Sequence, residues 1–390
     1  MALFFLALLT PVLANVVIEM ENKVNRRYTP EKIQSAVSFT SARYGAPSMR
    51  TLQFFDKSGD YTTVDLFNFN DLYYFGQVAI GSPSRSFSML FDTGSPVTWV
   101  PSSKCKTDGC APHTSYESTS GVVSQDKVDS HYGEGSISGV LAKDNATIGA
   151  DYNGVGGFKF DMTFVAATSL DNYFSDVLFG GVFGLSQSAL LPLVLSDPKK
   201  LTKTSLMQAF EQGAIKKQIV SFLLTNHKND GSYGSTVAIG GYNTSYTDKE
   251  ISWMPLVAND YWKVKSGEFK AGDTLLSKSS NVIFDTATTI NLVPSKVYKA
   301  IHEKLGGTYN GTFYHVPCTG STDLTIELGT KLVTIYYDTY VKPMGDGTCA
   351  TLFQTDYLIE DTFIFGDSFL REFYSIFDLD AKRVGLAVPK

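Results

Sequence analysis

The chain has 390 residues, of which 43% are apolar and 18% are charged, and its formal net charge is −6 at pH 7. This length allows two domains with separate cores, and the composition excludes a disordered chain. The acidic balance also excludes a protein that binds nucleic acid through a basic surface. Thirty-three glycines and 13% aromatic residues favour many strands joined by tight turns, so we expect an all-β fold with a few short helices.

Residues 1–14 are an uncharged apolar run that ends in Val-Leu-Ala. This pattern predicts a signal peptide cleaved after Ala14. The run is shorter than the roughly 20 residues needed to cross a bilayer, so no stable membrane insertion is expected. Three glycosylation sequons support entry into the secretory pathway; they begin at Asn145, Asn243 and Asn310.

Residues 15–60 carry seven basic and five acidic side chains, whereas the rest of the chain is acidic. A basic leader on an acidic body suggests a propeptide held partly by charge, which acid would release by protonating carboxylates. The alternative is an ordinary surface strand and helix of the first domain. Thr29 and Pro30 predict a helix start inside this segment.

Residues 61–242 form the predicted N-terminal lobe. A strand is expected at 73–80, followed by a turn at 81–83, and a buried strand at 87–91 delivers Asp92. Residues 131–136 predict a hairpin tip with glycine on both sides of Glu134. A helix at 205–210 should end at Gly213, and a strand at 236–241 precedes the lobe boundary.

Residues 243–390 form the predicted C-terminal lobe. A new strand series begins at 261–264, and a helix is expected from Pro294 to Leu305. Two strands around residues 378–380 close the chain at 373–386.

A turn sequence occurs twice and relates the two lobes. Phe-Asp-Thr-Gly-Ser at 91–95 returns as Phe-Asp-Thr-Ala-Thr at 284–288, and Val-Pro follows eight and nine residues after each Asp. An apolar-Phe-Gly element also recurs, at 182–184 and 364–366. Two matching copies with matching flanks predict that each lobe contributes one carboxylate, Asp92 or Asp285, to a shared site.

Two carboxylates at hydrogen-bond distance cannot both ionise easily, because like charges drive one pKa up. The pair shares one proton and titrates as a unit. One carboxylate can then activate a water while the other protonates a carbonyl oxygen. This predicts peptide hydrolysis at acidic pH without a covalent intermediate.

Four cysteines fall as one close pair in each lobe, and four cysteines allow three connectivities. We predict the pairing within lobes, Cys105–Cys110 and Cys318–Cys349. Zinc is the competing interpretation, but no Cys-x-x-Cys is present and the five histidines are scattered. We therefore expect no metal and no cofactor.

Along nearly its whole length the chain resembles a pepsin-like aspartic protease zymogen. The matching segments include Tyr-Phe-Gly at 74–76, the turn at 91–95, Trp-Val-Pro at 99–101, Tyr-Gly-x-Gly-Ser at 132–136, Phe-Gly-Asp at 365–367 and Val-Gly-Leu-Ala at 384–387. Aspartic proteases are the established example of a carboxylate pair that shares one proton.

The resemblance implies two related β lobes with a central cleft that binds extended peptides. The oligomeric state stays open, with a monomer as the default expectation. It implies that Asp92 and Asp285 are the catalytic pair, that Thr93 and Thr286 cross-brace the turns, and that Ser95 and Thr288 bond the outer carboxylate oxygens. The other residues it assigns are Gly94 and Ala287 in the turns, Tyr132, Gly133, Glu134 and Gly135 in a substrate-binding flap oriented by Trp99, and Arg43 and Tyr44 as an inhibitory pair in the propeptide.

One position departs from the family pattern, because Ala287 stands where the family has glycine. If the backbone there had a positive φ, alanine would cost about 1–2 kcal/mol. A second hypothesis concerns Glu134, because an acid at the flap tip would accept a basic substrate side chain beside the scissile bond.

One rival function stays open at this point, and two others are disfavoured by the sequence. A catalytically impaired relative would bind peptides or glycans through the same cleft, with Ala287 as its only supporting feature. A serine esterase is suggested by Gly366-Asp367-Ser368, but no histidine follows residue 315. Paired carboxylates also serve glycosidases, but the doubled Asp-Thr turn argues against that class. The expected location is secreted, vacuolar or lysosomal.

Overall fold

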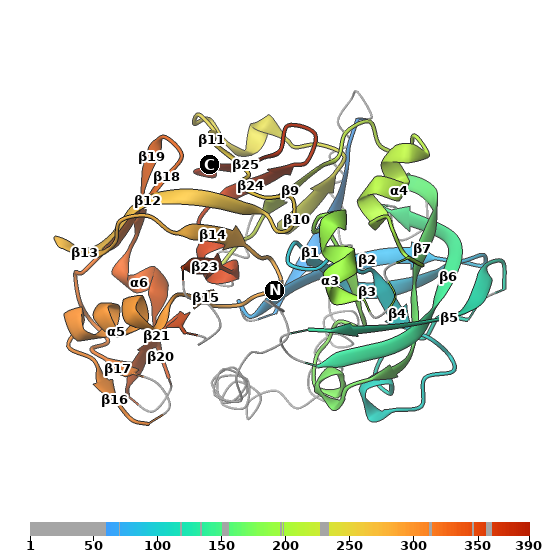
Figure 1. Ribbon diagram of the computed structural model, residues 1–390, viewed down its shortest axis with the longest axis horizontal. Coiled ribbons are helices and arrows are strands. Elements are labelled where there is room, and N and C mark those ends of the chain that lie inside the picture. The colour runs from blue at the N-terminus through green and yellow to red at the C-terminus, as the bar shows by residue number, and fades with distance from the viewer. Residues whose placement is uncertain are drawn as a thin grey trace, which may run out of the picture.

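The fold is described from a computed structural model of the chain, shown in Figure 1. The structure describes residues 60–69, 71–117, 119–132, 135–149, 156–195, 197, 199–226, 234–311, 314–344, 347–355 and 361–390. The predicted signal peptide, the propeptide up to residue 59 with Arg43 and Tyr44, and the flap residues Gly133 and Glu134 lie outside the described residues.

The described chain is mostly strand and forms two lobes, as the sequence predicts (Figure 1). The first sheet has the strand order β11-β25-β24-β9-β10-β1-β2-β3-β8-β4-β7-β6-β5. Its N-terminal-lobe part contains β1 (Thr62–Phe69), β2 (Tyr73–Ile80), β3 (Arg85–Asp92), β4 (Trp99–Pro101), β5 (Val122–His131), β6 (Ser136–Ile148), β7 (Phe158–Leu170) and β8 (Gly181–Gly184).

The other end of this sheet joins strands from both halves of the chain. There, β24 pairs with β9, and β1 pairs with β10, all antiparallel. The predicted boundary between residues 242 and 243 therefore falls inside a shared sheet, and the boundary itself stays a prediction. The strands involved are β9 (Ile219–Leu223), β10 (Ser235–Ile239), β11 (Ser252–Pro255), β24 (Tyr374–Asp378) and β25 (Arg383–Ala387).

Two further sheets build the C-terminal lobe, on the left of Figure 1. The larger has β13 paired to β12 and otherwise contains β12 (Lys263–Ala271), β13 (Thr274–Ser277), β14 (Asn281–Phe284), β15 (Asn291–Leu292), β18 (Leu324–Leu328), β19 (Lys331–Ile335), β22 (Phe353–Gln354) and β23 (Thr362–Phe365). The smaller contains β16 (Thr308–Tyr309), β17 (Tyr314–Val316), β20 (Val341–Pro343) and β21 (Cys349–Thr351).

Helices are short and lie between strands. Thr204 caps α4 by accepting a hydrogen bond from the Met207 N–H, and Gly213 ends this region with φ +71°, as the sequence predicts. The helix predicted over 294–305 is α5. The described helices are α3 (Leu191–Val194), α4 (Ser205–Glu211), α5 (Ser295–Lys304), α6 (Tyr337–Tyr340) and α7 (Asp367–Leu370), with 3₁₀ turns η1 (Asp108–Cys110), η2 (Asn172–Ser175), η3 (Ser188–Leu190) and η5 (Thr244–Tyr246).

The repeated sequence elements become neighbouring parallel strands in each lobe. In the N-terminal lobe β3 pairs with β8, which places Asp92 opposite Gly184. In the C-terminal lobe β14 pairs with β23, which places Phe284 opposite Phe365. Each apolar-Phe-Gly element thus runs beside the strand that carries an aspartate. As a result, the two Asp-Thr turns occupy equivalent positions in the two lobes.

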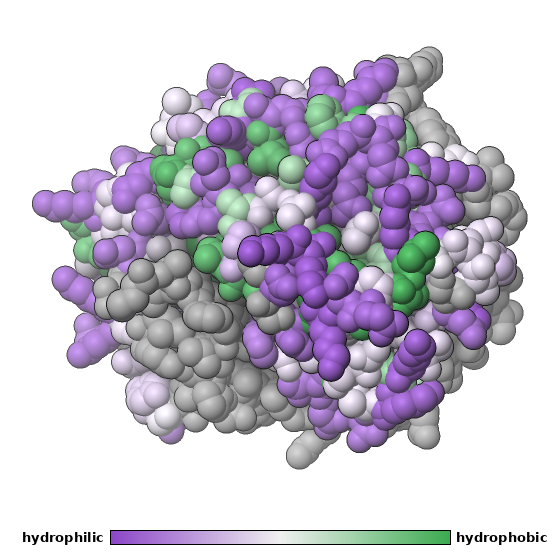
Figure 2. Space-filling model, turned by 45° about the vertical axis from the view of Figure 1, so that its right-hand side comes forward, coloured by the Kyte–Doolittle hydropathy of each residue, from purple (hydrophilic) through white to green (hydrophobic). Residues whose placement is uncertain are grey.

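Apolar side chains fill the interior on both sides of this pairing. One buried cluster extends through both lobes, and a second lies within the N-terminal lobe around Trp99 and Phe174. On the face seen in Figure 2, hydrophobic residues form small separate areas among hydrophilic ones. No helix in the described part of the chain is long and apolar enough to span a membrane.

Candidate active site

Two strand ends place the predicted aspartates in the interior. Asp92 is the last residue of β3, and Asp285 follows directly after β14. Their exposed fractions are only 2% and 5%. The partner strands hold the backbone on either side: the Leu185 N–H donates to the Asp92 carbonyl at 2.7 Å, and the Asp285 N–H donates to the Phe365 carbonyl at 3.0 Å.

Threonines link the two turns across the lobes. The Thr93 N–H donates to the Thr286 hydroxyl at 3.1 Å, and the Thr286 N–H donates to the Thr93 hydroxyl at 3.0 Å. Each hydroxyl also donates to the opposite lobe, Thr93 to the Phe284 carbonyl at 3.0 Å and Thr286 to the Phe91 carbonyl at 2.6 Å. Because these bonds are buried and reciprocal, they fix one turn relative to the other.

The turns also donate hydrogen bonds to their own carboxylates. Asp92 Oδ1 accepts from the N–H groups of Gly94 and Ser95 at 2.7 and 3.1 Å. Asp285 accepts at Oδ1 from the Ala287 N–H at 2.9 Å and at Oδ2 from the Thr288 hydroxyl at 2.8 Å.

The two predicted hydroxyl contacts differ. Thr288 bonds the carboxylate as expected. The Ser95 hydroxyl lies close enough to lower the pKa of Asp92, but it makes no hydrogen bond of normal geometry within the described residues. Ser95 instead contacts Asp92 through its backbone N–H.

The carboxyl groups occupy the same small space. A Cβ placed on Gly94 would lie 2.5 Å from Asp285 Oδ2, while the Gly94 N–H bonds Asp92. Gly94 therefore contacts one carboxylate and donates to the other. Glycine is required here because any larger residue would enter the space that Asp285 occupies.

Burial raises the pKa of both aspartates above the ordinary value. For Asp92 the negative charge of Asp285 raises the pKa further, against the hydrogen bonds from Ser95 and Gly94. For Asp285 the Ala287 N–H and the Thr288 hydroxyl oppose the effect of burial. These effects favour a pair that holds one proton and titrates as a unit.

Ala287 occupies an ordinary backbone conformation. Among the described residues, only Asp71 and Lys382 are non-glycine residues with positive φ. The strain considered for a positive φ at position 287 is therefore absent, and the backbone donor to Asp285 is retained. The Ala287 methyl group packs beside the N-terminal-lobe cluster that includes Trp99 and Tyr132.

Tyr132 lies at the end of the β5–β6 hairpin, where the sequence predicts a hairpin tip. Its ring is 6.4 Å from that of Trp99, measured between centroids. Burial raises the pKa of Tyr132, and the charge of Asp92 raises it further. The Tyr132 hydroxyl and the Trp99 N–H lie near each other without a hydrogen bond of normal geometry within the described residues. Gly135 has φ +83°, which glycine adopts without strain.

Asp367 is a neighbour of the pair that sequence reasoning did not assign. It is buried, and neither carboxyl oxygen makes a hydrogen bond within the described residues. Burial raises its pKa well above the ordinary value, Arg371 opposes this, and the charges of Asp285 and Asp92 add to it. The Phe-Gly-Asp segment was a signal for this residue, but the sequence does not show that its side chain faces the pair.

The remaining predicted positions lie away from the pair. Both predicted disulfides, Cys105–Cys110 and Cys318–Cys349, are present. Asn145 and Asn310 are exposed and Asn243 is half-buried, with its side chain accepting from the Ser245 N–H. No group of three His, Cys, Asp or Glu within the described ranges is arranged to hold a metal.

Comparison with known proteins identifies the family. The family described as eukaryotic aspartyl protease matches residues 73–388. The chain is 30% identical over 330 residues to pepsin A of Gallus gallus, covering 82% of this chain and 85% of the relative. It is 31% identical over 348 residues to a vacuolar aspartic protease of Candida albicans, covering 86% and 79%, and 29% identical over 337 residues to cathepsin E of Rattus norvegicus, covering 83% and 81%. The chain therefore belongs to the eukaryotic aspartyl protease family.

Proposed function

We propose that this aspartic-type endopeptidase hydrolyses peptide bonds at acidic pH with a water held between Asp92 and Asp285. The observation that carries the proposal is the joined pair of turns. Two buried carboxyl groups share the space beside Gly94, reciprocal threonine bonds fix their relative position, and burial raises both pKa values.

The proposed reaction uses the single shared proton. The carboxylate of the pair takes a proton from the water while the water oxygen attacks the peptide carbonyl carbon. The protonated carboxyl of the pair gives its proton to the carbonyl oxygen, which produces a tetrahedral diol. Proton return from the pair to the amide nitrogen then breaks the C–N bond and releases an amine and a carboxylic acid. No covalent enzyme intermediate forms.

Working pH follows from the direction of the pKa shifts. The pair needs one proton, so activity falls as pH rises through the raised pKa of the pair and the second carboxylate forms. The raised value keeps the proton in place at a higher pH than an ordinary aspartate would. At very low pH the base is also protonated, which gives an acidic optimum.

The segment before residue 61 is proposed to be a removable propeptide, and its basic character supports an electrostatic hold on an acidic body. A secreted, vacuolar or lysosomal location is supported by the apolar run at 1–14, the sequons and the vacuolar relative. The substrates proposed are peptides bound in extended form.

The test is hydrolysis of denatured haemoglobin or casein from pH 2 to pH 7 after acid treatment of the purified full chain. Acid-favoured cleavage with a fall in chain mass is expected, and the Asp92→Asn protein should be inactive in both respects. A folded wild-type protein that cleaves nothing at any pH would overturn the proposal. Retained binding of peptides or glycans in that case would instead indicate the impaired relative.

A further inference from the structure

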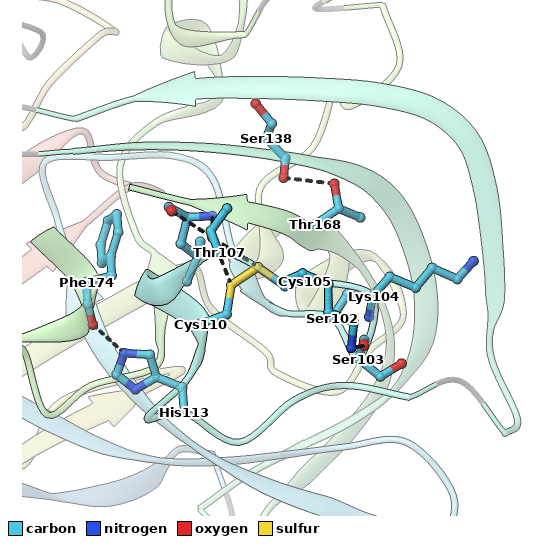
Figure 3. Close-up of a disulfide and its surroundings, with 12 residues drawn as sticks. Ser102, Ser103, Lys104, Cys105, Thr107, Cys110, His113, Ser138, Thr168 and Phe174 are labelled. Atoms are coloured by element: carbon cyan, nitrogen blue, oxygen red, sulfur yellow. Dashed lines mark hydrogen bonds between the residues drawn. A yellow bond between two sulfur atoms is a disulfide. The ribbon is translucent and has the colours of Figure 1, made fainter. Parts of the chain in front are cut away.

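A contact outside the aspartate pair connects a histidine to the hairpin that carries Tyr132. His113 follows the Cys105–Cys110 loop, and its Nε2 lies 2.6 Å from the Phe174 carbonyl (Figure 3). A carbonyl oxygen only accepts, so Nε2 carries the proton and the histidine donates. The backbone N–H of His113 also donates to the Cys110 carbonyl at 3.2 Å, which ties the backbone of His113 to the disulfide loop.

The space around the ring leaves it little freedom. A Cβ built on Gly180 would lie 2.8 Å from the His113 Cβ and 3.0 Å from Nδ1. The imidazole therefore lies directly against the Gly180 backbone, with Phe174 on the hydrogen-bonded side. The position of His113 thus determines where the carbonyl of Phe174, and the η2 turn that contains it, can sit.

The same disulfide loop holds the other end of this connection. The Thr107 hydroxyl donates to the Leu170 carbonyl at 2.9 Å and accepts from the Leu170 N–H at 3.0 Å. Leu170 is the last residue of β7, and η2 begins two residues later. The disulfide loop and His113 therefore hold the chain before η2 and η2 itself.

On its opposite side η2 packs against the wall of the site. The Phe174 ring meets the Trp99 ring edge-on with centroids 5.1 Å apart, and Trp99 in turn faces Tyr132. Phe174 also lies against the hairpin, because a Cβ on Gly135 would be 2.9 Å from its ring. Just before η2, the Asp171 N–H donates to the Ser136 carbonyl at 3.0 Å. A shift of η2 would therefore move Trp99 and the base of the hairpin together.

We propose that His113 is a positioning residue for Tyr132, acting through the Phe174 carbonyl, η2 and Trp99. It touches neither aspartate and takes no part in proton transfer. Its effect on the reaction rests on the proposed function, because Tyr132 matters only where a peptide lies over the pair. A displaced hairpin weakens peptide binding, so the change is expected in KM rather than in kcat.

The test compares His113→Phe, which removes the donor, with His113→Gln, whose amide N–H reaches a similar position. His113→Phe should raise KM about fivefold, the factor for one lost hydrogen bond, with kcat changed less than about twofold. His113→Gln should restore KM. The matched control is His302→Gln in the other lobe, where a buried histidine bonds the Tyr298 carbonyl at 2.7 Å and the Thr351 hydroxyl at 2.8 Å.

A spectroscopic arm separates positioning from general loss of stability. The chain has three tryptophans, so 5-fluorotryptophan labelling gives three ¹⁹F lines, and Trp99→Phe assigns one of them. His113→Phe should shift the Trp99 line, whereas His113→Gln and His302→Gln should leave it in place even where melting temperature falls. An unmoved Trp99 line in His113→Phe, or an equal KM change in His302→Gln, would overturn the proposal. If the wild type cleaves no peptide, the proposed function fails while the ¹⁹F arm still tests the position of Trp99.

Discussion

The two Asp-Thr turns share a backbone plan but differ in what their third residue contacts. Gly94 lies against the carboxylate of Asp285, and a Cβ there would come within 2.5 Å of its oxygen. Ala287 already carries a Cβ, keeps its N–H bond to Asp285 and places its methyl beside the N-terminal-lobe cluster. A duplicated motif therefore does not imply duplicated constraints, because each position is limited by the surface opposite it.

The largest expected effect comes from removing one member of the pair. Asp92→Asn should lower kcat by about 10³-fold or more, because the remaining carboxyl group cannot act as base and acid at once. The fold should persist, since asparagine can still accept from the Gly94 and Ser95 N–H groups. Peptide hydrolysis at the acidic optimum measures the loss, and residual activity within tenfold of wild type would contradict the assignment.

Gly94→Ala gives both turns alanine as their third residue and should disturb the site, because only position 94 lies against the Asp285 carboxylate. The added methyl must displace the Asp285 carboxylate, and a misplaced catalytic group costs about 10²-fold in rate. Steric overpacking should also lower the free energy of unfolding by about 1–3 kcal/mol. Activity and urea denaturation measure both. A fully active, stable variant would show that the close contact at Gly94 is not restrictive.

Thr93→Val and Thr286→Val test the bonds that join the turns. Each substitution leaves a buried N–H of the opposite turn without its acceptor, which should cost about 1–3 kcal/mol of unfolding free energy. The double variant should cost less than the sum, because both remove one reciprocal network. The exposed Thr119→Val is the matched control and should change stability by less than about 0.5 kcal/mol. Strict additivity would contradict a shared network.

Asp367→Asn tests whether this buried carboxyl group makes the stability of the protein depend on pH. The folded-state pKa of Asp367 is raised, so its contribution to stability is present at low pH and declines as pH rises through that value. Asparagine does not titrate, so the variant should lose less stability than wild type between acidic and neutral pH. Thermal melting from pH 3 to pH 8 measures this. Parallel curves for both proteins would show that folding does not raise the pKa of Asp367.

Much of this arrangement is local enough to be predicted from sequence. The strand at 73–80 matches β2 at both ends, and the aspartate strands, the partner glycines and both disulfides follow from repeated patterns. The pairing of β24 with β9 was not predicted, because antiparallel partners about 150 residues apart leave no local signal. The same holds for Asp367, whose position near the pair depends on how α7 packs.

Ala287 shows a second limit of prediction from sequence. Its identity was visible in the sequence, but its cost depended on a backbone angle that only the fold supplies. The structure gives it an ordinary φ, so the strain argument for an inactive relative does not apply.

The most direct test of this account is kcat/KM for Ala287→Gly beside wild type, on one peptide from pH 3 to pH 7. Because Ala287 retains the donor to Asp285 without a positive φ, the two proteins should agree within about threefold, below the effect of one typical hydrogen bond. An increase of about 100-fold or more in the glycine variant would contradict the account, because nearly 3 kcal/mol of transition-state stabilisation would then be missing from the natural chain.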